Sequence, residues 1–269
     1  MARIKVGSME IVAVQDLEAS FPVAGVFPDV PAEAWTAYRP IYPASFQDEN
    51  LRLNIGSFVI AGGGQTILVD TGLGPKTNPE MPGKLVDNLK ADGISVDDIS
   101  TVIFTHLHID HVGWNFQDGK ATFPRARYVV QQADWDHFSA QKDDAVVQAQ
   151  VVPLQATGAL NLVSGETQLT PEITLVPTPG HTPGHQSIVV SSGGERAFIA
   201  GDVGHHPAQV QETGWHVGFD NDGPMASATR RRVMEQLEQD GTRGCFGHFP
   251  APGFGLIVRD GGRRVFRAL

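Results

Sequence analysis

The stretch that decides the fold reads Thr105-His106-Leu107-His108-Ile109-Asp110-His111 and follows the β-branched run Thr101-Val102-Ile103. It places three imidazoles and one carboxylate within six consecutive positions. Groups this close together crowd and desolvate one another unless a cation holds them. A short apolar strand running into such a cluster sets the ligands at the end of the strand, where loops build sites. Nitrogen and oxygen donors without a thiolate suit zinc, manganese or iron, so the stretch predicts metal-assisted chemistry.

The size and composition of the chain favour a single domain over residues 1–269. Of the 269 residues 41% are hydrophobic, enough for a sizeable core, and 30 Gly with 18 Pro indicate many turns. A formal net charge of −10 argues against nucleic acid as the main partner. Arg230-Arg231-Arg232 is the one basic run, and we interpret it as the solvated face of a helix.

The cysteine content and the apolar runs indicate the compartment. Cys245 is the single cysteine, so no intramolecular disulfide can form, which suits a reducing environment. The first residues lack the apolar run of a signal peptide, and no later run approaches membrane-spanning length. We therefore expect a cytoplasmic protein without a membrane partner.

The rest of the chain mixes strands and helices without a linker between them. Strands are expected at residues 3–15, 51–70, 101–104, 127–130, 173–176, 187–190, 196–200, 244–246, 254–259 and 264–267. Helices are expected at residues 83–92, 132–150 and 224–239. Mixed blocks of this kind favour an α+β fold with packed sheets and helices outside. Residues 20–50 show no period and predict a long loop, either a lid, a contact in a homodimer or a merely packed segment.

Three further candidate ligands lie where expected strands end. They are His181 in a Pro/Gly-rich loop, Asp202 directly after Gly201, and His248 directly after Gly247. A single histidine in such a place is more often an ordinary surface or core side chain. Three of these residues beside the first cluster, however, bring the donors to seven, roughly the number that a two-metal site needs.

Five motifs in this order resemble those of the metallo-β-lactamase superfamily of metallohydrolases. They are Asp70 in Val-Asp-Thr-Gly, the His106–His111 cluster, His181, Asp202 and His248. The resemblance spans residues 70–248. It implies an αββα sandwich of two mixed β-sheets, with helices on the outer faces and two divalent metal ions at one edge between the sheets.

The resemblance also implies a role for each residue. The two ions would share seven ligands, divided as His106, His108 and His181 on the first, Asp110, His111 and His248 on the second, and Asp202 bridging both. Asp70 would orient a ligand imidazole, and His185 and His206 would support the site because the ligand positions are filled. Zinc is the expected metal, although manganese, iron and cobalt suit the same donors.

Hydrolysis of a lactone or ester by a metal-bridging hydroxide is the reaction that this resemblance implies. Asp202 argues against β-lactam antibiotics, because β-lactamases of this fold generally lack a carboxylate there. Quorum-quenching lactonases commonly have Tyr three residues after that Asp, whereas this chain has His205, which resembles the methyl-parathion-hydrolase-like branch. We expect Asp110 and His205 to be catalytic, with His205 donating a hydrogen bond to the oxyanion. A supporting position at the rim is the other interpretation of His205.

The sequence is compatible with two classes of small-molecule substrate. An acyl-homoserine lactone or aryl ester is favoured, and an organophosphate triester is the alternative. Trp114, Phe116 and Trp215 are expected to line an apolar substrate pocket, unless they pack in the core. A metal-stabilised non-enzymatic or sensory domain is the alternative of another class; structural zinc sites, however, usually have four ligands.

Overall fold

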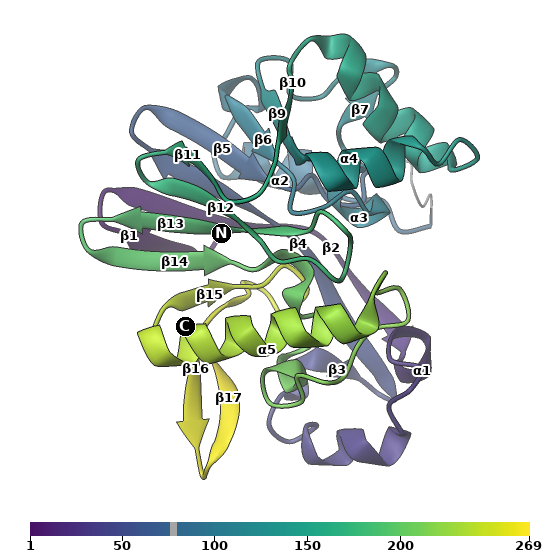
Figure 1. Ribbon diagram of the computed structural model, residues 1–269, viewed down its shortest axis with the longest axis vertical. Helices are drawn as coiled ribbons and strands as arrows, with labels where there is room; N and C mark the ends of the chain where they lie inside the picture. Colours follow the sequence, from purple (N-terminus) through teal and green to yellow (C-terminus); the bar gives the residue numbers. More distant parts are fainter. Residues whose placement is uncertain (76–79) are drawn as a thin grey trace.

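Two mixed β-sheets packed against each other form the centre of the molecule, with helices outside (Figure 1). The computed structural model describes residues 1–75 and 80–269. Its arrangement is the α+β sandwich that the sequence predicts. None of the helices in these two ranges is both long enough and apolar enough to cross a membrane.

The first sheet is antiparallel at one end and parallel at the other. Its order is β1-β2-β4-β5-β6-β9-β10, with β3 paired to β4. The strands are β1 (Arg3–Val6), β2 (Met9–Pro22), β3 (Phe46–Gln47), β4 (Asn50–Gly62), β5 (Gln65–Val69), β6 (Thr101–Ile103), β9 (Arg127–Gln131) and β10 (Leu160–Val163). The β5–β6, β6–β9 and β9–β10 pairs are parallel, so their connections cross over the sheet. One of these connections carries residues 106–111.

The second sheet is antiparallel except at one pair. Its strands, in spatial order, are β11 (Thr167–Thr170), β12 (Ile173–Pro177), β13 (Gln186–Ser192), β14 (Glu195–Ile199), β15 (Arg243–Cys245), β16 (Phe254–Asp260) and β17 (Arg263–Ala268). The parallel β14–β15 pair is joined by a crossover that contains the long helix α5 (Gly223–Asp240). A separate hairpin consists of β7 (Phe116–Gln117) and β8 (Lys120–Ala121).

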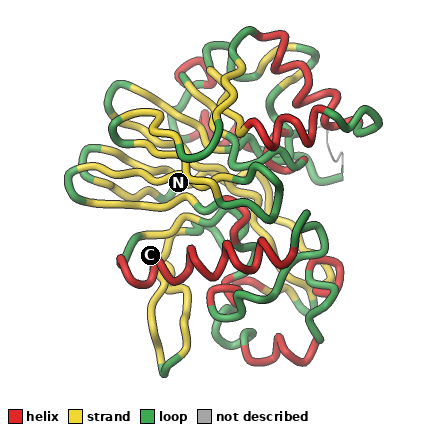
Figure 2. The backbone as a smooth tube through the Cα atoms, in the orientation of Figure 1, coloured by secondary structure: helices red, strands yellow, loops and turns green. Residues whose placement is uncertain are grey.

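The helices lie against the two outer faces (Figure 2). On the first sheet, α2 (Leu85–Ala91) and α4 (Gln132–Ser139) bury their apolar side chains, and α3 (Ile109–Val112) follows β6. On the second sheet, α5 buries Val233, Met234 and Leu237. The remaining helical turns are α1 (Val23–Val26), η1 (Ala32–Ala37), η2 (Pro43–Ser45), η3 (Val96–Asp98), the π-helix η4 (Val147–Val151), η5 (Val152–Thr157), η6 (Gly201–Val203) and η7 (Pro207–Val210).

Three apolar clusters correspond to the three interfaces between these layers. The central one joins the facing sides of the sheets, with Ile60 of β4 and Ile188 of β13 both fully buried. The other two join each sheet to its helices. Branched aliphatic residues dominate the central interface because their stiff side chains pack well on pleated surfaces.

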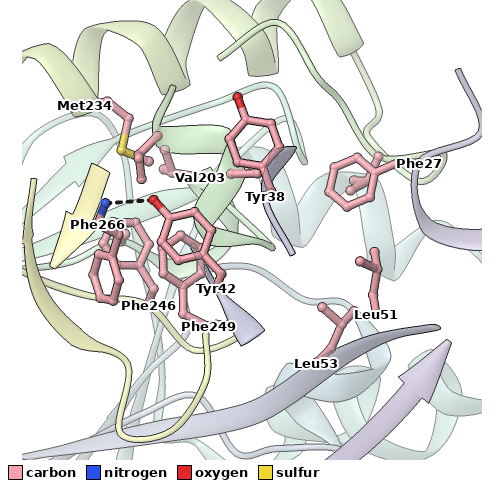
Figure 3. Packing of buried hydrophobic residues seen from close by; sticks show 14 of the residues in the cluster. Phe27, Tyr38, Tyr42, Leu51, Leu53, Val203, Met234, Phe246, Phe249 and Phe266 are labelled. Carbon is pink, nitrogen blue, oxygen red and sulfur yellow. Dashed lines mark hydrogen bonds between the residues drawn. The ribbon is translucent and has the colours of Figure 1, made fainter. Parts of the chain in front are cut away.

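Residues 20–50 do not form the long loop that their lack of period predicts. Strand β2 continues to Pro22, and the rest folds into α1, η1, η2 and β3. Figure 3 shows why: Tyr42 lies beside Phe249 and Phe266, and Tyr38 and Phe27 belong to the same cluster of buried side chains. The Tyr42 hydroxyl accepts a hydrogen bond from the backbone N–H of Phe266 at 3.0 Å. The segment is therefore anchored in the core by its aromatic side chains while most of its residues stay at least partly exposed, and a role as a lid or in a dimer contact stays a prediction.

Two other expectations are wrong in part. The helix expected over residues 132–150 ends at Ser139. A separate turn follows, at whose start Asp144 accepts hydrogen bonds from the N–H groups of Val146 and Val147. Arg230 is not on a solvated face, since its side chain is fully buried. Arg231 and Arg232 are exposed, as expected.

Candidate metal centre

The seven predicted ligands meet at one edge of the sandwich, where strands of both sheets end. The His106–His111 cluster follows β6 of the first sheet. His181, Asp202 and His248 follow β12, β14 and β15 of the second sheet. Strand ends are rigid, so they hold side chains that are far apart in sequence in a fixed relation.

Ligand atoms of these residues lie close enough to share metal ions. Within each of four groups the candidate atoms lie within 4.8 Å of one another. The groups are His106–His108–His181, Asp110–His111–His248, His106–His111–Asp202 and His181–Asp202–His205. The first two are the sets implied for the two metal positions, and the third links them through Asp202.

Asp202 occupies the middle of the cluster. Its Oδ2 atom lies 3.1 Å from Nε2 of His248 and 3.2 Å from Nε2 of His181. Its Oδ1 atom lies 3.4 Å from Nε2 of His111. The Asp202 carboxylate therefore contacts ligands of both sets, as a ligand shared between two metal positions must.

Four of the imidazoles are held from behind through Nδ1. The contacts are His106 to Thr105 Oγ1 at 3.0 Å, His111 to Asp70 Oδ2 at 2.9 Å, His181 to Asp220 Oδ1 at 2.7 Å, and His248 to the Asn54 carbonyl at 2.8 Å. Such contacts fix the tautomer and leave Nε2 free for a metal. His108 instead turns Nδ1 inward, 3.0 Å from His106 Nε2 and 2.9 Å from His181 Nε2.

Asp70 contacts His111 directly and His106 through Thr105, so it lies where the predicted orienting role requires. Its Oδ2 accepts the Thr105 hydroxyl at 2.7 Å as well as His111 Nδ1. Because that hydroxyl donates to Asp70, it must accept from His106 Nδ1. The Thr105 N–H completes the anchor by donating to Asp70 Oδ1 at 2.7 Å.

His185 contacts the backbone of Asp202, and its ring lies beside the ring of His106, with centroids 5.2 Å apart. Its Nε2 atom accepts a hydrogen bond from the Asp202 N–H at 2.9 Å. The preceding Gly201 has φ +55°, and a Cβ there would lie 2.7 Å from that Nε2. Glycine therefore permits the close approach, as its place before Asp202 predicts.

The electrostatics of the cluster fit the binding of divalent cations. Among the described residues, Nε2 of His111 and Oδ1 of Asp202 are buried without a hydrogen-bond partner, although both face the cluster. Burial lowers the pKa of His106, whereas at His111 the carboxylates of Asp202, Asp110 and Asp70 outweigh burial and raise the pKa. Burial would raise the pKa of Asp202, but the imidazoles around it hold that pKa well below its usual range. The nitrogen and oxygen donor set is that of zinc, manganese or iron.

A cavity of about 520 Å³ opens onto this cluster. Its polar lining consists of His108, Asp110, Asp202, His205 and His248. The rest of its wall is apolar and comes from Leu17, Phe21, Pro22, Gly25, Val26, Leu53, Ile55, Leu73, Met81, Ile109 and Phe219. A few convergent polar groups in an apolar cavity of this size are typical of small-molecule sites.

Comparison of the sequence with known protein families agrees with this geometry. The model of the metallo-β-lactamase superfamily matches residues 52–262, more than half of the chain. The chain belongs to this superfamily.

Relatives within the superfamily include N-acyl homoserine lactonases. One from a Bacillus species is 27% identical over 179 residues, which cover 65% of this chain and 64% of the relative. One from Bacillus thuringiensis, AiiA, is 26% identical over 177 residues, with the same coverage. The chain thus spans just under two thirds of the length of these curated relatives.

Solved structures of the superfamily share the fold over the full length. The dizinc quorum-quenching lactonase AidC has a TM-score of 0.87 at 22% identity, covering 100% of this chain and 97% of its own. The hydrolase AbOPH has a TM-score of 0.89 at 23% identity, covering 99% and 96%.

The three aromatic residues predicted to line the pocket lie elsewhere in this superfamily fold. Trp114 is buried beneath the first sheet and donates its indole N–H to Asp16 at 2.8 Å. Phe116 packs against the same core, and Trp215 packs against Trp35 and Tyr38. All three residues therefore pack in the core, which is the alternative interpretation of them. Phe21 and Phe219 line the cavity instead.

His205 and His206 point in different directions. Nε2 of His205 lies 3.1 Å from Oδ2 of Asp202, and the ring stacks on His248 with planes 11° apart. His206 packs edge-on against Trp35 and accepts the N–H of Ala208 at 3.0 Å. Only the first of the two reaches the cavity.

Two buried carboxylates at the centre were not predicted. Asp134 accepts hydrogen bonds from the Leu107 N–H, the Thr182 hydroxyl and the Gly184 N–H, so it ties the two ligand-bearing loops together. Burial raises the pKa of Asp134 to about 6 despite these bonds. Asp220 lies behind His181. Neither Asp134 nor Asp220 lies in a motif. The one weak signal in the sequence is that Asp134 lies in the first turn of a helix that directly follows a strand.

Proposed function

We propose that the protein is a dinuclear metal-dependent hydrolase of lactones or esters. The observation that carries this proposal is the convergence of seven donor residues, with Asp202 in their middle, beside an apolar cavity. His106, His108 and His181 would hold one ion, Asp110, His111 and His248 the other, with Asp202 between them. A structural metal site would need neither a cavity nor so many ligands.

Bound divalent ions would supply Lewis acidity and a water whose pKa is lowered toward 7. The chain's own residues would then orient the substrate and manage its charge. His205 would lie beside the reacting carbonyl, since its Nε2 shares the cavity floor with Asp202. An imidazole N–H there can donate to the oxyanion as charge develops. Asp110, which also lines the cavity, would act as a ligand close to the reaction.

An N-acyl homoserine lactone is the substrate class that we favour. The relatives from Bacillus are named for this activity. The apolar wall formed by residues such as Phe21, Leu53 and Ile55 suits an acyl chain, while the polar floor suits a lactone ring. An organophosphate triester is the second candidate, which His205 favours because it stands where lactonases commonly have Tyr.

The test compares three substrates on the zinc-loaded protein: N-hexanoyl homoserine lactone, an aryl ester and an aryl phosphotriester. We expect the lactone to give the highest kcat/KM. Asp110→Ala and His111→Ala should abolish turnover while the chain stays folded, and His137→Ala, an exposed histidine on α4, should match the wild type. Faster turnover of the phosphotriester would select the second candidate, and no turnover of any of the three would overturn both.

Zinc as the metal, the cytoplasm as the compartment and a homodimer as the assembly are parts of the same proposal. Elemental analysis of the purified protein would give the metal and its stoichiometry. One iron per chain would contradict the dinuclear site. Light scattering of the same sample would give the oligomeric state.

A further inference from the structure

Arg230 is a guanidinium enclosed in the protein beside the metal centre. It projects from α5, and its side chain has no exposed surface. Its Nε atom donates to the Val203 carbonyl at 2.6 Å. Its Nη1 atom donates to the carbonyls of Thr213 at 3.0 Å and Trp215 at 2.6 Å. Enclosing a charge is costly without a counter-charge, so a nearby carboxylate is expected.

Asp220 is that carboxylate, and it also contacts a ligand. Its Oδ2 atom lies 3.7 Å from Nη2 of Arg230, and neither side chain is exposed. Its Oδ1 atom lies 2.7 Å from Nδ1 of His181. The carboxylate therefore lies between the guanidinium and the imidazole and accepts a hydrogen bond from the Nδ1–H of His181, which leaves His181 Nε2 facing Asp202 at 3.2 Å.

The backbone around Asp220 fixes the same arrangement. The Val217 N–H donates to Asp220 Oδ2 at 3.1 Å. The next residue, Asn221, donates its N–H to the carbonyl of His181 at 2.9 Å. The loop thus holds both the ring and the main chain of His181.

We infer that Asp220 and Arg230 are positioning residues for the metal centre, acting on two of its ligands from one buried pair. Asp220 orients His181 directly. Arg230 fixes Asp220 and, through the Val203 carbonyl, the turn that carries Asp202. This inference rests on the proposed function in one respect, that His181 and Asp202 bind metal.

The test measures zinc affinity by chelator competition, without substrate. Asp220→Asn keeps the shape of the side chain and removes its charge. We expect the affinity for one of the two ions to fall ~10- to 100-fold, the usual effect of removing a carboxylate behind a ligand histidine. The visible spectrum of the cobalt-loaded variant should change at the same position, a signature that general loosening of the fold would not confine to one ion.

Matched controls come from the same helix and loop. Asp222→Asn removes the carboxylate that caps α5 by accepting the Met225 N–H, and Arg231→Lys changes an exposed arginine next to Arg230. Both should bind two ions like the wild type. Arg230→Lys should weaken the same ion as Asp220→Asn, because a lysine cannot reproduce the forked contacts of the guanidinium.

The inference would be overturned if folded Asp220→Asn bound two ions with wild-type affinity. It would also be overturned if Asp222→Asn lost as much zinc affinity as Asp220→Asn. If Asp220→Asn does not fold, Arg230→Lys decides by the same criterion. A wild-type protein that binds two ions but hydrolyses no substrate would sink the hydrolase proposal alone, because this assay needs no turnover.

Discussion

Asp70 and His111 face each other across the ends of neighbouring strands, with Oδ2 of the carboxylate 2.9 Å from Nδ1 of the imidazole. The same oxygen accepts the Thr105 hydroxyl. One side chain after β5 thus sets the orientation of ligands after β6. Asp70 holds a left-handed backbone conformation, φ +61°, to reach them.

Replacing Asp70 by Asn should weaken metal binding without unfolding the chain. The amide presents only one acceptor oxygen, so it cannot serve the Thr105 N–H and His111 together. Zinc affinity should fall ~10- to 100-fold in chelator competition. Asp87→Asn, at an exposed position on α2, is the control and should bind like the wild type. Unchanged affinity in Asp70→Asn would refute the orienting role.

Asp134 should make stability depend on pH. Burial raises its pKa from 3.8 in the unfolded chain to about 6 in the fold, so the folded form binds its proton more tightly. This contribution to stability is present below about pH 4 and is lost as pH rises through 6. The free energy of unfolding of the metal-free wild type, minus that of Asp134→Asn, should therefore decrease between pH 4 and 7. A difference that stays constant or rises would show that Asp134 is not protonated in this range.

Phe219 should set the preference for the acyl chain. The ring lines the cavity, packs against His205 with centroids 5.3 Å apart, and is 46% exposed. In Phe219→Ala the lost apolar contact of about 1 kcal/mol should raise KM for the hexanoyl lactone roughly fivefold and leave kcat nearly unchanged. Met225→Ala is the control, since this residue is similarly exposed at 45% and does not line the cavity. Equal effects of the two changes would contradict the assignment.

His205 should matter for turnover and not for metal content. If its imidazole donates to the oxyanion, His205→Ala should lower kcat on the lactone roughly 100-fold. Elemental analysis of the variant should still find two ions per chain. Loss of an ion would make His205 a ligand, and an unchanged kcat would leave it a supporting residue at the rim.

Removing the metals should lower thermal stability. A ligand present at about 1,000 times its Kd stabilises the folded state by ~4 kcal/mol. For a chain of this size that corresponds to roughly 10 °C in Tm. Differential scanning calorimetry with zinc and with excess chelator would measure the shift. Equal Tm values in the two conditions would contradict a buried centre.

The sequence predicts well which side chains meet in the cluster, because they lie in short motifs at the ends of strands. His181 and Asp202 each follow a glycine in a loop after a strand, and nothing else in the sequence around them accounts for an ionisable side chain there. Two residues behind these side chains, Asp220 and Arg230, lie in no such motif, so the sequence does not predict their role. Asp220 and Arg230 are 10 residues apart in sequence and meet only because α5 packs on the second sheet. No spacing rule connects them to His181.

The pocket could not be predicted from aromatic residues near the cluster. Trp114 follows the ligands directly in sequence, yet the chain turns there and buries the indole against Asp16. Phe21 is distant in sequence and reaches the cavity because β2 runs to its edge. Which side of a turn a side chain takes depends on tertiary packing.

The division of the ligands between the sheets has a consequence for how the protein could be monitored. Neither sheet with its loops carries all the ligands of either predicted ion, so metal binding requires the two halves of the sandwich to be in contact. Mixing separately expressed halves and following cobalt colour would therefore give a direct optical signal of their association, independent of any substrate.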